Sequence, residues 1–230
     1  MIRFVPETGS TNADLLALAH GGEPEGAWLR AGSQTGGRGR LERTWLSPPG
    51  NLYASTIVRP LPGDSGAPTL ALVAAVALEE VASAYAGDGK LQLKWPNDLM
   101  AGQAKLAGIL LERGGDAVVI GFGVNLAHHP VNLDRPTTSI AALGCAAPDP
   151  AAFVVELADA FARWLGVWRG EGLAPIRTRW MQRAHPIGSV LATGDVEGLF
   201  EGLDPDGALL LRRADGRIAT VHAGDVFLSS

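Results

Sequence analysis

The spacing of hydrophobic and polar positions divides the chain into a long first part and a short last part. In the first part, segments with apolar residues at helical spacing alternate with β-rich runs. The predicted helices run between Ser10 and Gly21 and over residues 69–85, 150–168 and 173–184. The predicted strands cover residues 2–6, 28–31, 52–58, 91–95, 105–112 and 117–125. A hairpin at Ala101-Gly102-Gln103 is predicted to join the strands over 91–95 and 105–112.

Helix-start signals precede two of these helices. The Ser10 hydroxyl can accept an unpaired amide of the first helical turn. Asp149-Pro150 combines an N-cap residue with proline at the first helical position. The helix over 69–85 is rich in alanine and leucine and is predicted to be mostly buried, whereas its Glu79 is interpreted as a solvated position. The run over 52–58 alternates and is β-rich, which predicts a strand.

After His185-Pro186 the chain consists of short β runs separated by turns. The runs cover residues 190–193, 198–203, 209–212, 217–221 and 225–228. Asp206-Gly207 and Asp215-Gly216, which lie between runs, are hairpin signals. So many short strands in so little chain predict a small barrel-like module over residues 186–230, beside a larger domain over residues 1–185.

Composition is typical of a globular protein and disfavours two classes of function. Of the 230 residues, 47% are hydrophobic and 19% are charged, which is the balance of a folded chain rather than a disordered one. The net charge of −5 disfavours a protein whose main task is to grip nucleic-acid phosphates, since such domains are usually basic. The longest apolar stretch, Leu70–Leu78, is about half of a membrane span, so no membrane association is expected.

Few residues bear on compartment and metal binding. Cys145 is the single cysteine, so it forms no intrachain disulfide and is interpreted as a small buried hydrophobe. Residues 1–7 contain neither the apolar segment nor the cleavage site of a secretion signal, and a cytoplasmic protein is therefore expected. His128-His129 has no ligand-spaced partner, so no zinc site is predicted.

Two stretches combine charge with turn-forming residues. Gly36–Arg43 contains three glycines and three arginines; its amides and guanidinium groups would suit phosphate, and a solvated surface loop is an equally good alternative. The predicted strand that ends in Lys94-Trp95-Pro96-Asn97-Asp98 presents an amide and a carboxylate. The Asp98 carboxylate suits Mg²⁺ or a ribose, and turn chemistry is the alternative.

Two apolar strands carry residues of chemical interest. Lys105 opens the run Lys105–Glu112, where partial desolvation would strengthen its attraction for a carboxylate or a phosphoryl group. A lysine that extends to solvent is the alternative. Gly121 and Gly123 interrupt the strand that ends at Asn125, which predicts that a ligand or a packed helix approaches the backbone closely.

The order and spacing of these stretches resemble biotin–protein ligases over about residues 3 to 229. The matching segments are Ser10-Thr11-Asn12, Gln34–Arg40 with Arg43 and Trp45, Asn51-Leu52-Tyr53, Lys94–Asp98, Lys105–Leu110 and Gly121–Asn125. Each segment alone is unspecific, but the loop and the two strands that follow it, in this order, are specific together. The resemblance implies an α+β fold, in which a mixed β-sheet catalytic domain of the class II synthetase-like type is backed by helices. It also implies a small C-terminal SH3-like β-barrel over residues 187–230.

The resemblance further implies ATP- and Mg²⁺-dependent formation of biotinyl-5′-AMP and transfer of biotin to a lysine of a biotin carboxyl carrier domain. The implied catalytic residues are Lys105, Arg38, Arg40 and Asp98, with Lys105 bridging the biotin carboxylate and the phosphoryl oxygen and Asp98 serving Mg²⁺ or the acceptor lysine. The implied substrate contacts are Ser10, Thr11, Asn12, Gln34, Gly37, Arg38, Gly39, Arg40, Lys105, Gly108, Gly121 and Gly123. The implied nucleotide contacts are Arg40, Arg43, Trp45, Asn51, Lys94, Asn97 and Asn125, and no residue is assigned as a metal ligand.

The chain departs from the family pattern at Glu42, where the loop usually has glycine. It offers no room for the N-terminal winged helix of family members that repress transcription, so DNA binding is not expected, and a homodimer is expected from the family. Two alternatives remain. A lipoate or octanoate–protein ligase is related in fold, but is not expected to combine this loop with Lys-Trp-Pro-Asn-Asp. A non-catalytic biotin- or nucleotide-binding sensor would need no cations aimed at a reacting phosphate.

Overall fold

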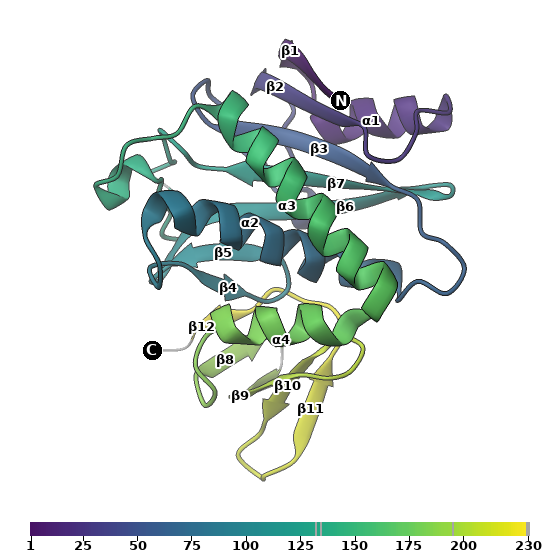
Figure 1. Cartoon of the computed structure of the whole chain (residues 1–230). Coiled ribbons are helices and arrows are strands. Elements are labelled where there is room, and N and C mark those ends of the chain that lie inside the picture. The colour runs from purple at the N-terminus through teal and green to yellow at the C-terminus, as the bar shows by residue number, and fades with distance from the viewer. Residues whose placement is uncertain (132, 134, 195, 229–230) are drawn as a thin grey trace.

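The computed structural model describes residues 1–131, 133, 135–194 and 196–228, and Figure 1 shows a large sheet with helices against it and a smaller sheet below. The large sheet has the order β1-β2-β3-β7-β6-β5-β4, in which β1 and β2 pair in parallel and the other neighbours are antiparallel. Its strands are β1 (Ile2–Thr8), β2 (Trp28–Gln34), β3 (Leu52–Val58), β4 (Gln92–Lys94), β5 (Asp98–Ala101), β6 (Ala104–Gly114) and β7 (Ala117–Val124). The mixed sheet confirms the predicted α+β class.

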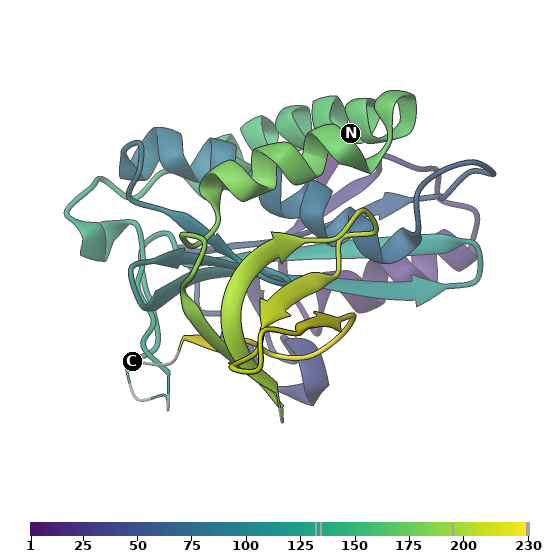
Figure 2. The same ribbon diagram turned by 90° about the horizontal axis from the view of Figure 1, so that it is seen from below.

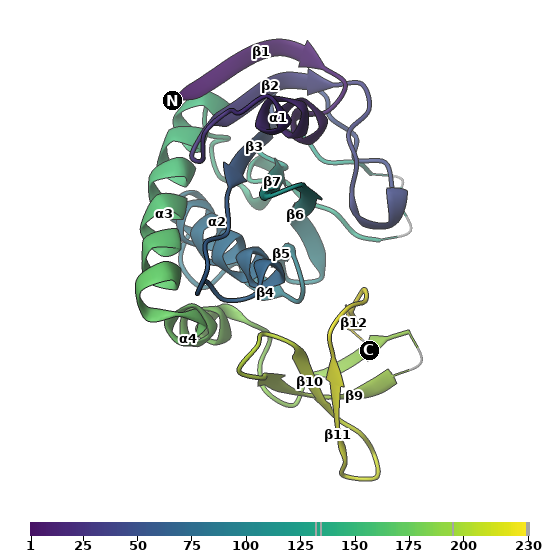
Figure 3. The ribbon, with the colours of Figure 1, turned by 90° about the vertical axis from the view of Figure 1, so that its right-hand side faces the viewer.

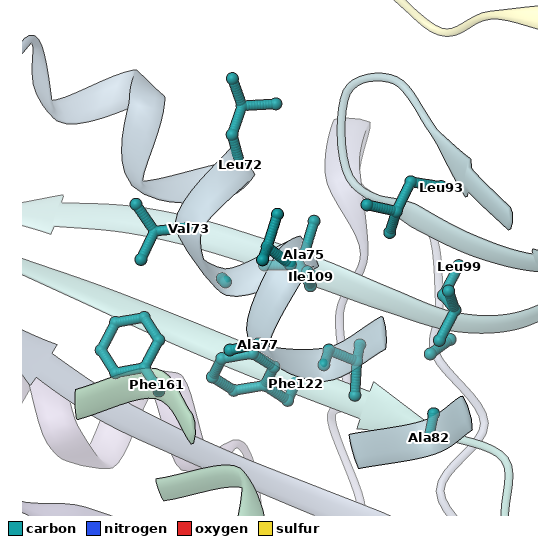
Figure 4. Close-up of a cluster of buried hydrophobic side chains, with 14 of the residues drawn as sticks. Leu72, Val73, Ala75, Ala77, Ala82, Leu93, Leu99, Ile109, Phe122 and Phe161 are labelled. Carbon is teal, nitrogen blue, oxygen red and sulfur yellow. The ribbon is translucent and has the colours of Figure 1, made fainter. Parts of the chain in front are cut away.

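Helices lie on both faces of this sheet. They are α1 (Thr11–His20), α2 (Leu70–Ala86), α3 (Pro150–Glu171) and α4 (Leu173–Arg183), with short 3₁₀ turns η1 (Arg40–Glu42), η2 (Ala67–Thr69) and η3 (Ala141–Leu143). Figure 3 shows α2 and α3 on one face and α1 on the other. The larger core cluster, which includes Val73, Phe122 and Phe161, fills the α2 and α3 face (Figure 4). A smaller cluster with Leu15 and Val119 lies under α1.

Because both faces are covered, all seven residues of β3 are buried. The predicted strand over 52–58 is confirmed, and its alternation separates two buried environments, not core from solvent. Ser55, in the middle of the strand, is 0% exposed. A polar group buried so completely needs hydrogen-bond partners, and those of Ser55 prove to lie beside the functional site.

The predicted helix starts are confirmed. The Ser10 hydroxyl accepts the Ala13 amide at 3.4 Å, and the Asp149 carboxylate accepts the Ala151 amide at 3.2 Å with Pro150 in the first turn. The Ser10 cap fixes where α1 begins. It thereby places Thr11 and Asn12 at the end of the helix that faces β3 and β7.

Helix α2 is the core helix of the domain, as predicted. Within the described chain, the segment 67–86 is long and apolar enough to cross a membrane by length and composition, but 72% of its most apolar window is buried inside the fold. Cys145 is partly buried and packs against the same core, which agrees in part with its interpretation as a small hydrophobe.

The region between β4 and β6 differs from the prediction. The turn after Ala101 does form a hairpin, but it joins β6 to β5, a strand of four residues that the sequence did not indicate. β4 pairs with β5 in turn, and places Lys94 opposite Asp98. The strand is short and directly follows the turn formers Pro96-Asn97, which hid its β character. As a result Asp98 lies inside the sheet and not at a free strand end.

Glu79 is also different from its interpretation as a solvated residue. It is 1% exposed, and Arg179 donates to one of its carboxylate oxygens at 2.8 Å. Arg183 lies 3.3 Å from the other oxygen, and Ser83 also donates to it, at 2.8 Å. Both arginines come from α4, whose packing against α2 could not be predicted from the spacing of apolar residues in α2.

Replacing Glu79 by alanine is expected to lower the free energy of unfolding by about 3 kcal/mol, because it leaves two arginine charges facing the core without their anion. Urea denaturation followed by circular dichroism measures the change. Glu171→Ala, at an exposed position of α3, is the control and should change stability by less than about 0.5 kcal/mol. Equal stability of the two variants would contradict this account of Glu79.

The smaller sheet is antiparallel, with the order β11-β10-β9-β8-β12. Its strands are β8 (Val190–Thr193), β9 (Val196–Leu203), β10 (Leu209–Arg212), β11 (Ile218–Val221) and β12 (Phe227–Leu228), which agrees with the five predicted runs. Figure 2 views the molecule from the side of this sheet and shows its curved strands. The Trp95 indole of the large domain donates to the carbonyl of Gly207 at 3.1 Å, so the two parts are joined close to β4.

Candidate functional site

A cavity of about 340 Å³ lies against the large sheet, a size suited to a small-molecule ligand. The start of α1, the loop that contains η1, strands β5 to β7 and the segment after β7 all contribute to it, and Asp225 and Val226 come from the C-terminal part. Figure 3 shows the η1 loop on the side of the sheet away from α3. The predicted residues that line the cavity are Ser10, Thr11, Asn12, Gln34, Arg38, Gly39, Arg40, Arg43, Trp45, Lys94, Asn97, Asp98, Lys105, Gly108, Gly121, Gly123 and Asn125.

The β5 and β6 wall of the cavity carries two lysines on one carboxylate. The Lys105 ammonium lies 2.5 Å from Asp98 Oδ1, and the Lys94 ammonium lies 3.6 Å from Asp98 Oδ2. Burial lowers the pKa of Lys94, and the neighbouring Asp98 only partly opposes this effect. Lys105 retains 27% exposure of its side chain, and Trp45 lies beneath its ammonium at 5.4 Å. Lys105 is therefore the more accessible cation for a ligand anion.

The arginines of the loop lie at another part of the cavity and face carboxylates of the protein. Arg38 donates to Glu112 at 3.1 Å. Arg43 lies 2.5 Å and Arg40 3.5 Å from Asp225 of the C-terminal part. Burial opposes the charge of Asp225, but Arg43 and Arg40 outweigh burial and lower its pKa. The site thus concentrates positive charge and neutralises part of it with side chains that a ligand anion could replace.

Backbone conformation singles out the middle of the same loop. Leu41 and Glu42 both have positive φ angles, 55° and 57°, which L-residues other than Asn and Asp adopt at a cost. Glu42 stands where the resembled family usually has glycine, the residue for which this conformation is free of strain. The Glu42 side chain is exposed.

The glycines of β6 and β7 allow two side chains to lie directly on the sheet. A Cβ on Gly121 would lie 2.2 Å from Asn12 Oδ1, and one on Gly123 would lie 2.6 Å from the Trp45 ring. The predicted close approach to these glycines is confirmed, and the groups that approach in this structure are side chains of the protein itself. Asn12 and Trp45 therefore form part of the cavity floor.

Two predicted residues lie outside the cavity lining. Asn51 Oδ1 accepts the amides of Leu126, Ala127 and His128 at 2.9–3.0 Å, and its amide donates to the His128 carbonyl. The structure therefore gives Asn51 the role of bracing the segment after β7 and not of a contact in the cavity. Gly37 is packed against Trp45, whose carbonyl oxygen would lie 2.5 Å from a Cβ at this position, so it shapes the loop from behind.

Four polar residues at the site were not predicted. Glu112 lies beside Arg38 and Asn12, and Ser55 lies beneath Asn12. The period of two along β6 places Glu112 on the face of Gly108, which is a usable signal, and a serine within an apolar strand is another. Arg135 and Asp225 follow from tertiary packing alone. In the described part of the chain, no group of three or more histidine, cysteine or acidic side chains suits a metal ion.

Comparison with known proteins gives matches over both parts of the chain. The model of the Biotin/lipoate A/B protein ligase family matches residues 8–125, and that of the Biotin protein ligase C terminal domain matches residues 189–229. A Biotin--[acetyl-CoA-carboxylase] ligase of Paracoccus denitrificans is 41% identical, over 97% of this chain and 99% of its own. A biotin protein ligase of Aquifex aeolicus, solved with biotin and ATP, shares the fold with a TM-score of 0.88 at 24% identity and 99% coverage of both chains. A Leishmania major ligase solved with Biotinyl-5-AMP has a TM-score of 0.70 at 26% identity, over 96% of this chain and 98% of that one.

Proposed function

Because this chain belongs to the biotin/lipoate A/B protein ligase family and a biotin ligase is 41% identical to it over nearly the full length, we infer that it is a biotin–protein ligase that uses biotin and ATP. One observation carries the proposal at the level of residues: a single cavity joins polar side chains at the start of α1 to Lys105 and the arginines of the loop. A neutral polar headgroup and two reacting anions need such a combination.

The reaction has two steps with different demands. A carboxylate oxygen of biotin attacks the α-phosphorus of ATP, pyrophosphate leaves, and a mixed anhydride, biotinyl-5′-AMP, forms. The carboxylate and the triphosphate repel each other, so cations must stand where they meet. We assign this task to Lys105, which bridges the two reacting groups, with Arg38 and Arg40 on the loop above them. In the second step a lysine amine attacks the acyl carbon and AMP leaves.

The remaining side chains of the cavity are assigned by their place in it. Ser10, Thr11, Asn12 and Gln34 would hold the ureido headgroup, since hydroxyl and amide groups can satisfy a buried polar ring. Trp45, Arg43, Asn97, Lys94 and Asn125 would serve the nucleotide. Asp225 brings the C-terminal part to the phosphate end, where it already faces Arg40 and Arg43. The loop would close over the adenylate and keep water from the anhydride.

Magnesium is expected to enter with the nucleotide. Mg²⁺ usually binds through phosphate oxygens, waters and only one or two carboxylates. Among the described residues of the cavity lining, Asp98 and Asp225 carry carboxylates, and each already faces lysines or arginines. These residues fit a metal ion that is held chiefly by ATP, whose charge it would offset, with Asp98 as its protein neighbour.

The acceptor is proposed to be a biotin carboxyl carrier domain of a biotin-dependent carboxylase, presenting its lysine at the mouth of the cavity. We further propose domains over residues 1–185 and 186–230, a cytoplasmic location, where ATP and the acceptor are made, and no binding to DNA. The homodimer stays a prediction, which light scattering of the purified protein would test.

The function is tested by transfer of labelled biotin to a carrier domain. Label should appear on the acceptor lysine only when ATP and Mg²⁺ are present, and labelled lipoate under the same conditions should give none. Labelling from lipoate instead would move the protein to the related lipoate ligases. Tight binding of biotin without transfer would favour the sensor alternative.

Substitution of Gly121 by alanine is expected to raise the KM for biotin about 10-fold or more, because the new Cβ would displace Asn12 from the cavity floor. Biotin-dependent ATP–pyrophosphate exchange measures the effect. Gly166→Ala is the matched control, since nothing lies within 4 Å of its added Cβ in α3; its KM should equal that of the wild type. An unchanged KM in Gly121→Ala would remove Asn12 from the biotin site.

A further inference from the structure

A continuous set of hydrogen bonds runs beneath the polar end of the cavity. Ser55 donates to Asn12 Oδ1 at 2.6 Å, and the Asn12 amide nitrogen donates to Glu112 Oε2 at 2.7 Å. Thr11 Oγ1 lies 2.7 Å from Ser55 Oγ and 3.2 Å from Gln34 Oε1, and the Thr11 backbone amide donates to the same Gln34 oxygen at 2.9 Å. These groups come from α1, β2, β3 and β6 and meet directly above Gly121, which pairs with both Ser55 and Leu110 in the sheet.

Glu112 and Ser55, the two hydrogen-bond partners of the Asn12 side chain, fix the orientation of its amide. Glu112 faces Arg38 on one side and Asn12 on the other, and a carboxylate in that setting accepts hydrogen bonds from both. The Asn12 nitrogen must therefore point to Glu112 and its oxygen to Ser55. In the reverse orientation the Asn12 oxygen would face the carboxylate, and two acceptors would repel each other.

The fixed amide in turn fixes the hydrogen of Thr11. Ser55 has a single hydrogen and donates it to Asn12 Oδ1, so the 2.7 Å contact between Ser55 and Thr11 requires the Thr11 hydrogen. The other acceptor near that hydrogen, Gln34 Oε1, is more distant, at 3.2 Å. Ser55 is 0% and Thr11 4% exposed, so water does not offer either hydroxyl an easy substitute partner. Thr11 lines the cavity, and its oxygen is left with lone pairs to present to a ligand. The Thr11 oxygen therefore offers the ligand a hydrogen-bond acceptor.

We propose that Ser55 and Glu112 are positioning residues that make the pocket select a headgroup with a ureido N–H, by holding Thr11 as a hydrogen-bond acceptor through Asn12. This inference rests on the proposed function and deepens it. The ureido ring of biotin carries N–H groups, whereas the dithiolane ring of lipoate carries none. A ligand without a donor would leave the buried Thr11 oxygen unpaired, which is the way a polar site rejects an otherwise similar substrate.

The test is biotin-dependent ATP–pyrophosphate exchange with Ser55→Ala. Without the Ser55 hydroxyl the Thr11 hydrogen loses its nearer acceptor and keeps only Gln34 Oε1, at 3.2 Å. It can then turn toward the ligand, so the KM for biotin should rise about 10-fold, a size typical of a lost buried hydrogen bond to substrate. The KM for ATP and kcat should stay within about 2-fold of the wild type, because the lost contact is made equally before and during reaction. Ser55→Thr, which keeps the hydroxyl, should restore most of the affinity for biotin.

The preference for biotin over a methylated analogue is a second measurement, which a general loss of structure would not change. An analogue methylated on both ureido nitrogens should bind the wild type far more weakly than biotin. In Ser55→Ala this preference should shrink by about the same 10-fold, since the acceptor is no longer enforced. Equal weakening of biotin and the methylated analogue would show a merely structural role and overturn the proposal.

A control variant and a second test variant make the result of this experiment decisive. Ser33→Ala removes a serine whose hydroxyl bonds Glu7 on the neighbouring strand, and it should leave both KM values unchanged. Should Ser55→Ala not fold, Glu112→Gln carries the same test, because the Glu112 side chain is 26% exposed and one of its two oxygens becomes a donor. An unchanged KM for biotin in both variants would overturn the proposal. A wild-type protein without biotin-dependent exchange would instead contradict the proposed function.

Discussion

Replacement of Lys105 by methionine is expected to lower the rate of biotinyl-5′-AMP formation by about 10² to 10³-fold, the usual cost of losing a positioned charge at a reacting oxygen. Lys105 opens β6, its ammonium lies 2.5 Å from Asp98, and its side chain is 27% exposed toward the cavity. Among the lysines of the cavity it is the accessible one, since Lys94 is 9% exposed. Methionine keeps the length and the apolar stem and removes only the charge.

The effect of Lys105→Met should be confined to the first step. Single-turnover formation of the adenylate from biotin and ATP measures that step, and chemically prepared biotinyl-5′-AMP supplied with the carrier domain measures the second step alone. Transfer from the supplied adenylate should fall by less than about 10-fold, because the carboxylate is already activated. Lys90→Met, at an exposed position after α2, is the control. Adenylate formation at the wild-type rate in Lys105→Met would refute the assignment.

The sequence predicted those features that depend on short stretches of chain. Ser10 and Asp149 marked helix starts through their own capping chemistry, and the glycines of β7 marked a close approach. The loop arginines and Lys105 were found because each lies in a motif whose residues are neighbours in the chain. The structure brings these motifs to one cavity, as the resemblance implied.

Features that depend on pairing between distant segments were missed. Ser55 matters because the register places it opposite Gly121, and nothing in the apolar run over 52–58 reveals that register. Glu79 is buried because α4 brings two arginines to it. Asp225 reaches the cavity only through the packing of the C-terminal part. Asn51 was taken for a ligand contact because it lies in a matching segment, whereas its side chain makes four hydrogen bonds to backbone groups.

The role of Asp98 also depends on pairing between segments and not on its local motif alone. The resemblance implied that it serves Mg²⁺ or the acceptor lysine, and the sequence placed it at the tip of a strand. In the structure it is the first residue of β5, it is 9% exposed, and it lies between Lys105 and Lys94. A carboxylate held between two ammonium groups is placed first of all to set their positions. We therefore expect Asp98 to serve the first step by orienting Lys105.

Substitution of Asp98 by asparagine is accordingly expected to lower adenylate formation about 100-fold, because a displacement of Lys105 by about 1 Å is enough for a loss of that size. The shape of the side chain is kept, and the amide cannot hold both lysines. Asp116→Asn is the matched control: Asp116 also pairs with a cation at 2.6 Å, but its side chain is 79% exposed, and exposed pairs contribute little. Single-turnover adenylation and transfer from supplied adenylate separate the two roles. Loss confined to adenylation would assign Asp98 to Lys105, whereas intact adenylation with lost transfer would show that its carboxylate acts on the acceptor amine.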